Sequence, residues 1–199
     1  MTAMAPERTD GRFERRSRRV AYENPWMTVW HDEVSRPDGS DGIYGVVHFE
    51  HLAVGILVLD DQDRTVLVGQ HRYTLDEVSW EIPEGGVPSD ESALQGARRE
   101  LREETGLQAA TWVELGRLST SNSITDERAV LFLATDLTQG EAAPEPSESL
   151  ELRWLAFSDV LAMTLDGRIH DALTVVAVER VALARSIAAV SGAGVSGGQ

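Results

Sequence analysis

The chain of 199 residues contains no cysteine. This absence excludes a thiol nucleophile, a cysteine-ligated zinc site and a disulfide framework. Since nothing in the chain needs an oxidising compartment, we expect a cytoplasmic protein. No apolar stretch reaches the roughly 18 residues that a membrane-spanning helix requires, and none follows the arginine-rich segment 12–19, so we expect neither export nor membrane insertion.

Basic residues are also scarce. Lys and Arg total 18 against 33 Asp and Glu, which gives a formal net charge of −15 at pH 7. Such a charge repels a polyanion, so nucleic acid is not an expected partner. A small anionic substrate remains compatible with it if a bound divalent cation or a few arginines offset the average field near the site.

The chain divides into four expected regions. Residues 1–18 are polar, basic and without periodicity, and residues 191–199 are rich in Gly and Ser, so both ends are predicted to be flexible. Residues 19–50 contain two β-like runs around an Asp-Gly turn, which predicts a β-hairpin. Residues 51–190 mix strand and helix patterns without an internal repeat and predict the main domain.

One helix of the main domain has clear start and stop signals. Ser89 or Asp90 can cap its N-terminus, and Gly106 can cap its C-terminus in a left-handed conformation. The loop before it, 83–88, holds two prolines and two glycines and is not expected in regular structure. Elsewhere we expect strands at 53–59, 65–73, 78–82, 112–118, 129–137 and 152–157, helices at 158–164 and 170–190, and an acidic loop at 140–151.

The predicted helix carries three carboxylates on one edge. Glu100, Glu103 and Glu104 stand at i, i+3 and i+4, while Leu101 belongs to an apolar edge that can dock on the sheet. Like charges at this spacing repel, and Arg99 can offset only part of the repulsion. A hard cation with oxygen ligands would offset the rest, although an acidic helix edge taken alone is most often a solvated face.

The wider spacing changes this interpretation. It reads Gly85-x5-Glu91-x7-Arg99-Glu100-Leu101-x-Glu103-Glu104-x-Gly106-Leu107. This pattern matches every fixed position of the Nudix box, so the chain resembles the Nudix hydrolase family. The resemblance implies an α/β fold, an α/β/α sandwich with a mixed β-sheet, plus an N-terminal β-hairpin or small sheet.

The resemblance also implies a metal site. It makes Glu100 and Glu104 direct ligands of Mg²⁺, with Mn²⁺ as a possible substitute. Glu103 would be a ligand or would bind a water, and the Gly85 carbonyl would complete the set. The implied reaction is attack of water on phosphorus without a covalent intermediate.

Three other positions of the box have implied structural roles. Arg99 would orient a helix glutamate through a charge-assisted hydrogen bond. Glu91 would steady the junction of loop and helix. Gly106 would end the helix.

Beyond the box, residues from about 26 to 183 are similar to the ADP-ribose pyrophosphatase-like branch, which splits nucleoside diphosphate sugars into a nucleoside monophosphate and a sugar phosphate. The similarity rests on the N-terminal hairpin and on three short runs. These are Gln-His-Arg-Tyr at 70–73, Trp-Glu-Ile-Pro at 80–83 and Ser-Ile-Thr-Asp-Glu at 123–127.

This branch implies a general base on the loop after the box helix. Glu127 occupies that place and would position or deprotonate the attacking water, with Asp126 as the alternative. Glu103 and Glu104 are rival bases, and an ordinary loop carboxylate is the simplest other interpretation of Glu127.

The branch further implies four substrate-binding residues and a homodimer. Arg72 would bind a substrate phosphate, and Glu81, on the strand that enters the box, would also bind the substrate. Trp26 and Tyr44 would sandwich the base in a homodimer in which the hairpin reaches the partner subunit. The alternatives are a surface arginine and ordinary hairpin core.

One departure from the branch concerns specificity. ADP-ribose-specific members carry a proline about sixteen residues past the box, whereas this loop has Asn122 and Ser123 there. Substrates resembling GDP-mannose or UDP-glucose therefore stay open beside ADP-ribose. The rival functions are a nucleoside triphosphate or dinucleotide pyrophosphohydrolase and a non-catalytic nucleotide sensor, whereas the lack of cysteine excludes the isopentenyl diphosphate isomerases of this fold.

Overall fold

The computed structural model describes residues 11–140 and 150–193, and these fall into two compact units. The N-terminal unit runs to Glu50 and includes Ser119–Glu127. The main unit comprises His51–Leu118 and the chain from Arg128 onward. The outermost parts of both expected flexible ends and most of the expected acidic loop lie outside the described residues.

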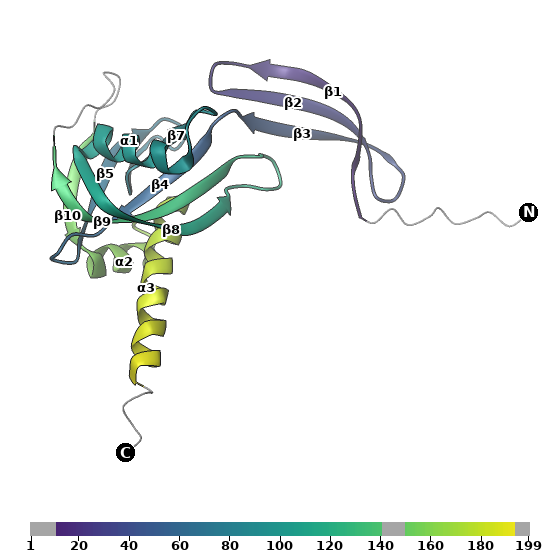
Figure 1. Cartoon of the computed structure of the whole chain (residues 1–199). Coiled ribbons are helices and arrows are strands. Elements are labelled where there is room, and N and C mark those ends of the chain that lie inside the picture. The colour runs from purple at the N-terminus through teal and green to yellow at the C-terminus, as the bar shows by residue number, and fades with distance from the viewer. Residues whose placement is uncertain (1–10, 141–149, 194–199) are drawn as a thin grey trace, which may run out of the picture. The chain divides into compact units, whose positions relative to one another are not determined.

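The N-terminal unit is built on a three-stranded antiparallel sheet (Figure 1). Its strands, in the order β1-β2-β3, are β1 (Glu14–Glu23), β2 (Met27–Ser35) and β3 (Asp41–Phe49). The expected hairpin is present as β2 and β3. The expected flexible segment 1–18 is wrong from residue 14 onward, because β1 begins there.

Strand β1 has no apolar pattern because every one of its residues is exposed. Polar side chains fasten it to the rest of the sheet instead. Arg18 donates two hydrogen bonds of 2.7 Å to the carboxylate of Asp32, and Arg16 donates one of 2.7 Å to Ser35 and another to Asp41. A hydrophobic periodicity search cannot find a strand that is held in this way.

The described residues of the main unit form two further sheets and three helices. One sheet has the order β10-β5-β6 and the other the order β7-β4-β9-β8. Strands β4 and β9 are parallel while β4 and β7 are antiparallel, so the second sheet is mixed, as expected. The elements are β4 (Leu52–Val58), β5 (Arg64–Arg72), β6 (Glu77–Glu81), β7 (Glu84–Val87), α1 (Ala93–Thr105), β8 (Leu107–Ser119), β9 (Arg128–Gln139), β10 (Glu151–Ala156), α2 (Phe157–Leu165) and α3 (Ala172–Ala193).

Two apolar cores lie on opposite faces of the sheet that contains β4. Ile56 packs in a cluster with Leu101 of α1, and the next residue, Leu57, packs in a second cluster with Val178 of α3. Successive strand residues point to opposite faces, so β4 serves both cores. Helix α1 lies on one side of the sheet and α2 and α3 on the other (Figure 1), which confirms the α/β/α sandwich.

Two local predictions around the box were wrong. The loop expected at 83–88 contains the strand β7, which pairs with the edge of β4 and is flanked by prolines rather than interrupted by them. The N-cap of α1 is Ser92 instead of Ser89 or Asp90. Ser92 Oγ accepts from the Gln95 amide at 3.3 Å, and the Gln95 side chain accepts from the Ser92 amide at 2.9 Å, which is a capping box.

The end of α1 agrees with the prediction. Gly106 caps it with a φ of 73°, a left-handed conformation that glycine adopts without steric cost. The strands and helices expected after α1 correspond to β8, β9, β10, α2 and α3, although β10 ends one residue before the expected strand and α3 begins two residues after the expected helix start. Across residues 11–140 and 150–193, no helix combines the length and the apolar character needed to cross a membrane.

Candidate active site

The packing of helix α1 against strand β7 brings two box carboxylates to the backbone of β7. Glu104 Oε2 accepts a hydrogen bond of 3.1 Å from the amide of Glu84. The carboxyl group of Glu100 lies so close to Gly85 that a Cβ added there would be 2.2 Å from Glu100 Cδ. Position 85 therefore requires glycine, because a side chain would displace the carboxylate.

Arg99 ties the helix and the loop together. Its Nη1 donates hydrogen bonds to Glu100 at 2.7 Å and to Glu103 at 3.0 Å. Its Nε donates to Glu91 at 3.2 Å, and its Nη2 donates to the carbonyl of Gly86 at 2.8 Å. Partial burial opposes the charge of this guanidinium, but the hydrogen bond and charge of Glu100 outweigh it and raise the pKa of Arg99.

A second charged cluster lies at the entry to the box. Arg72, at the end of β5, donates from Nε to Glu81 at 3.0 Å and from Nη2 to Glu84 at 2.7 Å. Carboxylate oxygens of Glu81, Glu84 and Asp171 lie within 4.8 Å of one another. Asp171 also accepts from the Thr174 amide at 2.7 Å, so the start of α3 holds it in place.

The two glutamates of this cluster have opposite pKa shifts. Burial raises the pKa of Glu84 well above its usual value, and the charges of Asp171 and Glu81 add to the shift. Burial would also raise the pKa of Glu81, but the hydrogen bonds from Arg72 outweigh it and keep that pKa below its usual value. Within the described ranges, Glu84 Oε2 is buried without a hydrogen-bond partner.

The charge of this region is strongly negative. Two arginines, Arg72 and Arg99, face a larger set of carboxylates: Glu81, Glu84, Glu91, Glu100, Glu103, Glu104 and Asp171. A hard divalent cation takes oxygen ligands of this kind. The donor set and the excess of negative charge therefore fit a divalent cation at the box.

Sequence reasoning missed Glu84 and Asp171. Glu84 lies directly before Gly85, outside the fixed positions of the box, and its contact with Arg72 depends on the pairing of β7 with β4. Asp171 is far from the box in sequence. Its position directly before α3 is the signal of an N-cap, but that signal says nothing of the neighbouring carboxylates.

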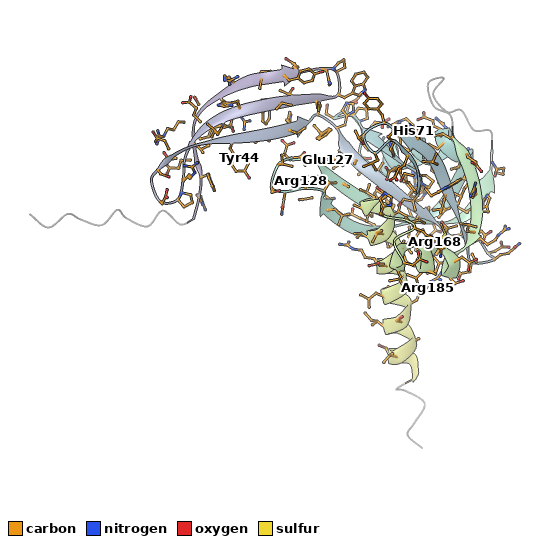
Figure 2. All side chains as sticks on the ribbon, turned by 180° about the vertical axis from the view of Figure 1, so that it is seen from behind. Tyr44, His71, Glu127, Arg128, Arg168 and Arg185 are labelled. Atoms are coloured by element: carbon orange, nitrogen blue, oxygen red, sulfur yellow. The ribbon has the colours of Figure 1, made fainter. Side chains whose placement is uncertain are left out.

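The loop with the expected general base belongs to the N-terminal unit. The hydroxyl of Tyr44, on β3, donates to the carbonyl of Ser123 in this loop at 2.7 Å. Tyr44 and Glu127 thus belong to the same unit (Figure 2). Glu127 Oε2 accepts from the Thr120 hydroxyl at 2.6 Å. Asp126, the expected alternative base, has one oxygen 2.6 Å from His48 Nδ1, and its other oxygen accepts from the Phe49 amide at 3.2 Å.

The two aromatic residues expected at the base differ in exposure. Trp26 is 76% exposed, so the alternative that it is hairpin core is wrong. Tyr44 is half-buried, and its ring meets that of Phe13 edge-on at a centroid distance of 5.6 Å.

Two protein-family models match this chain. Residues 49–174 match the NUDIX domain family, and residues 13–47 match the nucleoside diphosphate sugar hydrolase N-terminal domain. The chain therefore belongs to the Nudix family of hydrolases.

Two sequence relatives and one solved structure are similar to this chain over most of its length. The chain is 32% identical over 171 residues to an ADP-ribose pyrophosphatase of Mycobacterium tuberculosis, covering 83% of this chain and 81% of the relative. It is 30% identical to a methanol dehydrogenase activator of Bacillus methanolicus, covering 78% and 85%. A solved ADP compounds hydrolase superposes with a TM-score of 0.77 at 20% identity over 85% of this chain and 91% of that one, which shows the shared fold. The resemblance to the ADP-ribose pyrophosphatase-like branch is confirmed.

Proposed function

We propose that this Nudix hydrolase is Mg²⁺-dependent and splits the pyrophosphate bond of a nucleoside diphosphate sugar, with ADP-ribose as the first substrate to test. The products would be a nucleoside monophosphate and a sugar phosphate. The observation that carries the proposal is the convergence of Glu100 and Glu104 on the backbone at Gly85 and Glu84. Mn²⁺, which also accepts oxygen ligands, is a possible substitute.

The box residues would hold the cation. Glu100 and Glu104 are the proposed direct ligands, Glu103 binds the ion or one of its waters, and the Gly85 carbonyl completes the set. A bound Mg²⁺ supplies charge to the diphosphate oxygens and lowers the pKa of a coordinated water. Arg99 fixes Glu100 and Glu103 by the hydrogen bonds described above, which keeps their carboxylates in one orientation.

Arg72 is the proposed phosphate-binding residue. Its Nε and Nη2 are occupied by Glu81 and Glu84, whereas its Nη1 makes no hydrogen bond among the residues that the structure describes. The two glutamates fix the plane of the guanidinium. The remaining N–H groups therefore keep one orientation, in which they could donate to a phosphate oxygen. Glu81 would thus contribute to substrate binding by holding Arg72.

Glu127 is the proposed general base, which would orient the attacking water and accept its proton. Both oxygens of Asp126 are engaged by other groups, which supports Glu127 over Asp126. Glu103 and Glu104 would then serve the cation.

We also propose a homodimer in which Trp26 and Tyr44 bind the nucleotide base. The N-terminal unit exposes apolar side chains that a second copy of the chain would cover: Phe13, Val20, Tyr22, Trp26 and Ile43. Gel filtration with light scattering at micromolar concentration tests the assembly. A monomer mass would contradict it.

A substrate screen tests the activity. The full chain is incubated with ADP-ribose, other sugar nucleotides, dinucleoside polyphosphates and nucleoside triphosphates, with and without Mg²⁺, and products are identified by mass. We expect Mg²⁺-dependent formation of a nucleoside monophosphate and a sugar phosphate. A monophosphate with pyrophosphate would instead indicate a nucleoside triphosphate pyrophosphohydrolase, and tight nucleotide binding without turnover would indicate a sensor.

The same screen addresses specificity. Asn122 and Ser123 stand where ADP-ribose-specific members carry proline, so we propose a range of sugar nucleotides wider than ADP-ribose. Comparable kcat/KM values for ADP-ribose and either GDP-mannose or UDP-glucose would support this. A strong preference for ADP-ribose alone would contradict it.

A further inference from the structure

The loop 119–127 depends on the N-terminal sheet for its conformation. Two backbone hydrogen bonds join the loop to β3. The Val47 amide donates to the Ile124 carbonyl at 2.9 Å, and the Asp126 amide donates to the Val47 carbonyl at 3.3 Å. Val47 and Thr125 form an isolated parallel bridge. None of the loop's residues belongs to either apolar core, so packing does not fix the loop. Polar contacts therefore decide its shape.

His48 and Asp126 make one of these polar contacts, and it joins the loop to β3. The His48 Nδ1 lies 2.6 Å from Asp126 Oδ2, and the Phe49 amide donates to Asp126 Oδ1 at 3.2 Å, so both oxygens of one carboxylate are held by consecutive residues of β3. Because the two groups contact different oxygens, they restrict both the position and the rotation of the Asp126 side chain. The pair links residues that lie 78 apart in the sequence.

The imidazole of His48 is itself held in place. Its ring stacks on that of Trp30 at a centroid distance of 4.2 Å and an interplanar angle of 17°. On β1, Arg18 places its guanidinium carbon 3.7 Å from the centre of the Trp30 ring, and Asp32 fixes Arg18. These contacts run across all three strands of the sheet and end at the loop, so the orientation of His48 is predetermined.

We propose that His48 and Asp126 are positioning residues that set the orientation of Glu127. This inference rests on the proposed role of Glu127 as general base. Asp126 is the residue directly before Glu127, so fixing the Asp126 backbone and side chain limits the directions that the Glu127 carboxylate can take. The Thr120 hydroxyl, 2.6 Å from Glu127 Oε2, completes the restraint from the other end of the loop. A base held in one direction transfers a proton more efficiently than a mobile one, because the ordering entropy is already lost before the reaction.

The first test separates kcat from KM. We expect His48→Ala to lower kcat by about 10- to 100-fold with KM changed less than about threefold, because a misplaced base slows chemistry while the substrate-binding residues remain. His48→Asn should recover much of the loss, because its amide nitrogen can reach the place of Nδ1 and donate to Asp126. His31→Ala, on neighbouring β2, is the matched control, with kcat unchanged. Equal kcat in the wild type, His48→Ala and His31→Ala would overturn the proposal.

The second test asks whether His48 acts through Glu127. If it does, adding His48→Ala to Glu127→Gln lowers kcat no further, because the base is already absent. Independent, multiplying losses would overturn the proposal. Backbone hydrogen exchange supplies a readout apart from activity, since the Asp126 amide should exchange faster in His48→Ala and normally in His31→Ala.

These outcomes distinguish the two proposals. A large loss in Glu127→Gln, with His48→Ala normal in both kcat and exchange, would remove the positioning role and leave the base assignment standing. Full activity of Glu127→Gln would remove the base assignment and, with it, the positioning role. Faster exchange in that case would still show that His48 holds the loop.

Discussion

The two units of this protein are stabilised by different interactions. In the main unit, residues of β4 such as Ile56 and Leu57 are completely buried on opposite faces of the sheet. In the N-terminal unit, only Asp32 and Val34 are buried among the described residues, and β1 has none. Arginine–carboxylate pairs connect the strands there. One unit depends on apolar burial and the other on polar pairing.

The difference bears on function. The box carboxylates lie on a helix whose other face is anchored in an apolar core, so their backbone is rigid. The loop of Glu127 is held by hydrogen bonds between exposed or half-buried groups, which open at lower free energy. The proposed metal ligands therefore stand on the stable part of the molecule, and the proposed base stands on the more adaptable part.

The largest expected effect concerns the box. Glu104→Gln removes charge at the proposed cation site with little change in volume, so kcat should fall by about a thousandfold or more while the fold is retained. Steady-state kinetics with Mg²⁺ and a thermal melt measure both. Glu179→Gln, on the exposed face of α3, is the control and should keep full activity. Near-normal turnover of Glu104→Gln would contradict the ligand assignment.

A second prediction compares the stability of the two units. Leu101→Ala creates a cavity at a completely buried position of α1 and should lower the free energy of unfolding by about 2–5 kcal/mol. Val20→Ala, at an exposed position of β1, should lower it by less than about 0.5 kcal/mol. Urea unfolding followed by circular dichroism measures both. Equal losses would mean that β1 is buried in solution, as a second copy of the chain would bury it.

A third prediction addresses the close approach of helix α1 to strand β7. Gly85→Ala places a Cβ within 2.2 Å of Glu100 Cδ and should lower kcat/KM by about a hundredfold, because it displaces a proposed ligand. Gly86→Ala is the matched substitution, since its Cβ would meet nothing closer than His51 Nδ1 at 3.4 Å. Its loss should be much smaller. Equal losses would show that backbone flexibility, rather than contact with Glu100, is what both glycines provide.

The smallest expected effect is the acid sensitivity of the N-terminal sheet. The hydrogen bond from Arg18 holds the pKa of Asp32 below its usual value. A carboxylate with a lowered pKa in the folded state contributes stability above about pH 4, and this is lost as the pH falls through the lower, folded-state pKa. In NMR titrations, the Trp30 indole signal should shift in this acid range in the wild type and stay flat in Asp32→Asn. An unchanged titration in the variant would show that Asp32 is not the responsible group.

Sequence reasoning located the box and most of the main unit because both have strong local signals. Helix geometry is the same in any context. Residue spacing alone therefore predicts that Glu100, Glu103 and Glu104 share one edge of a helix that ends at Gly106. Buried strands such as β4 and β9 contain continuous apolar runs. The true N-cap at Ser92 was missed because several residues that can cap a helix stand in a row.

Tertiary structure alone decided the remaining features. The pairing of β7 with β4 is one of these features. Three side-chain contacts are others: Glu100 with Gly85, Arg72 with Glu84, and His48 with Asp126. Each joins residues of different elements, and residue spacing does not state which elements meet. A helix brings together residues three and four apart, and that can be read from spacing. A sheet and a loop bring together residues from distant parts of the chain, and only the folded chain specifies which ones meet.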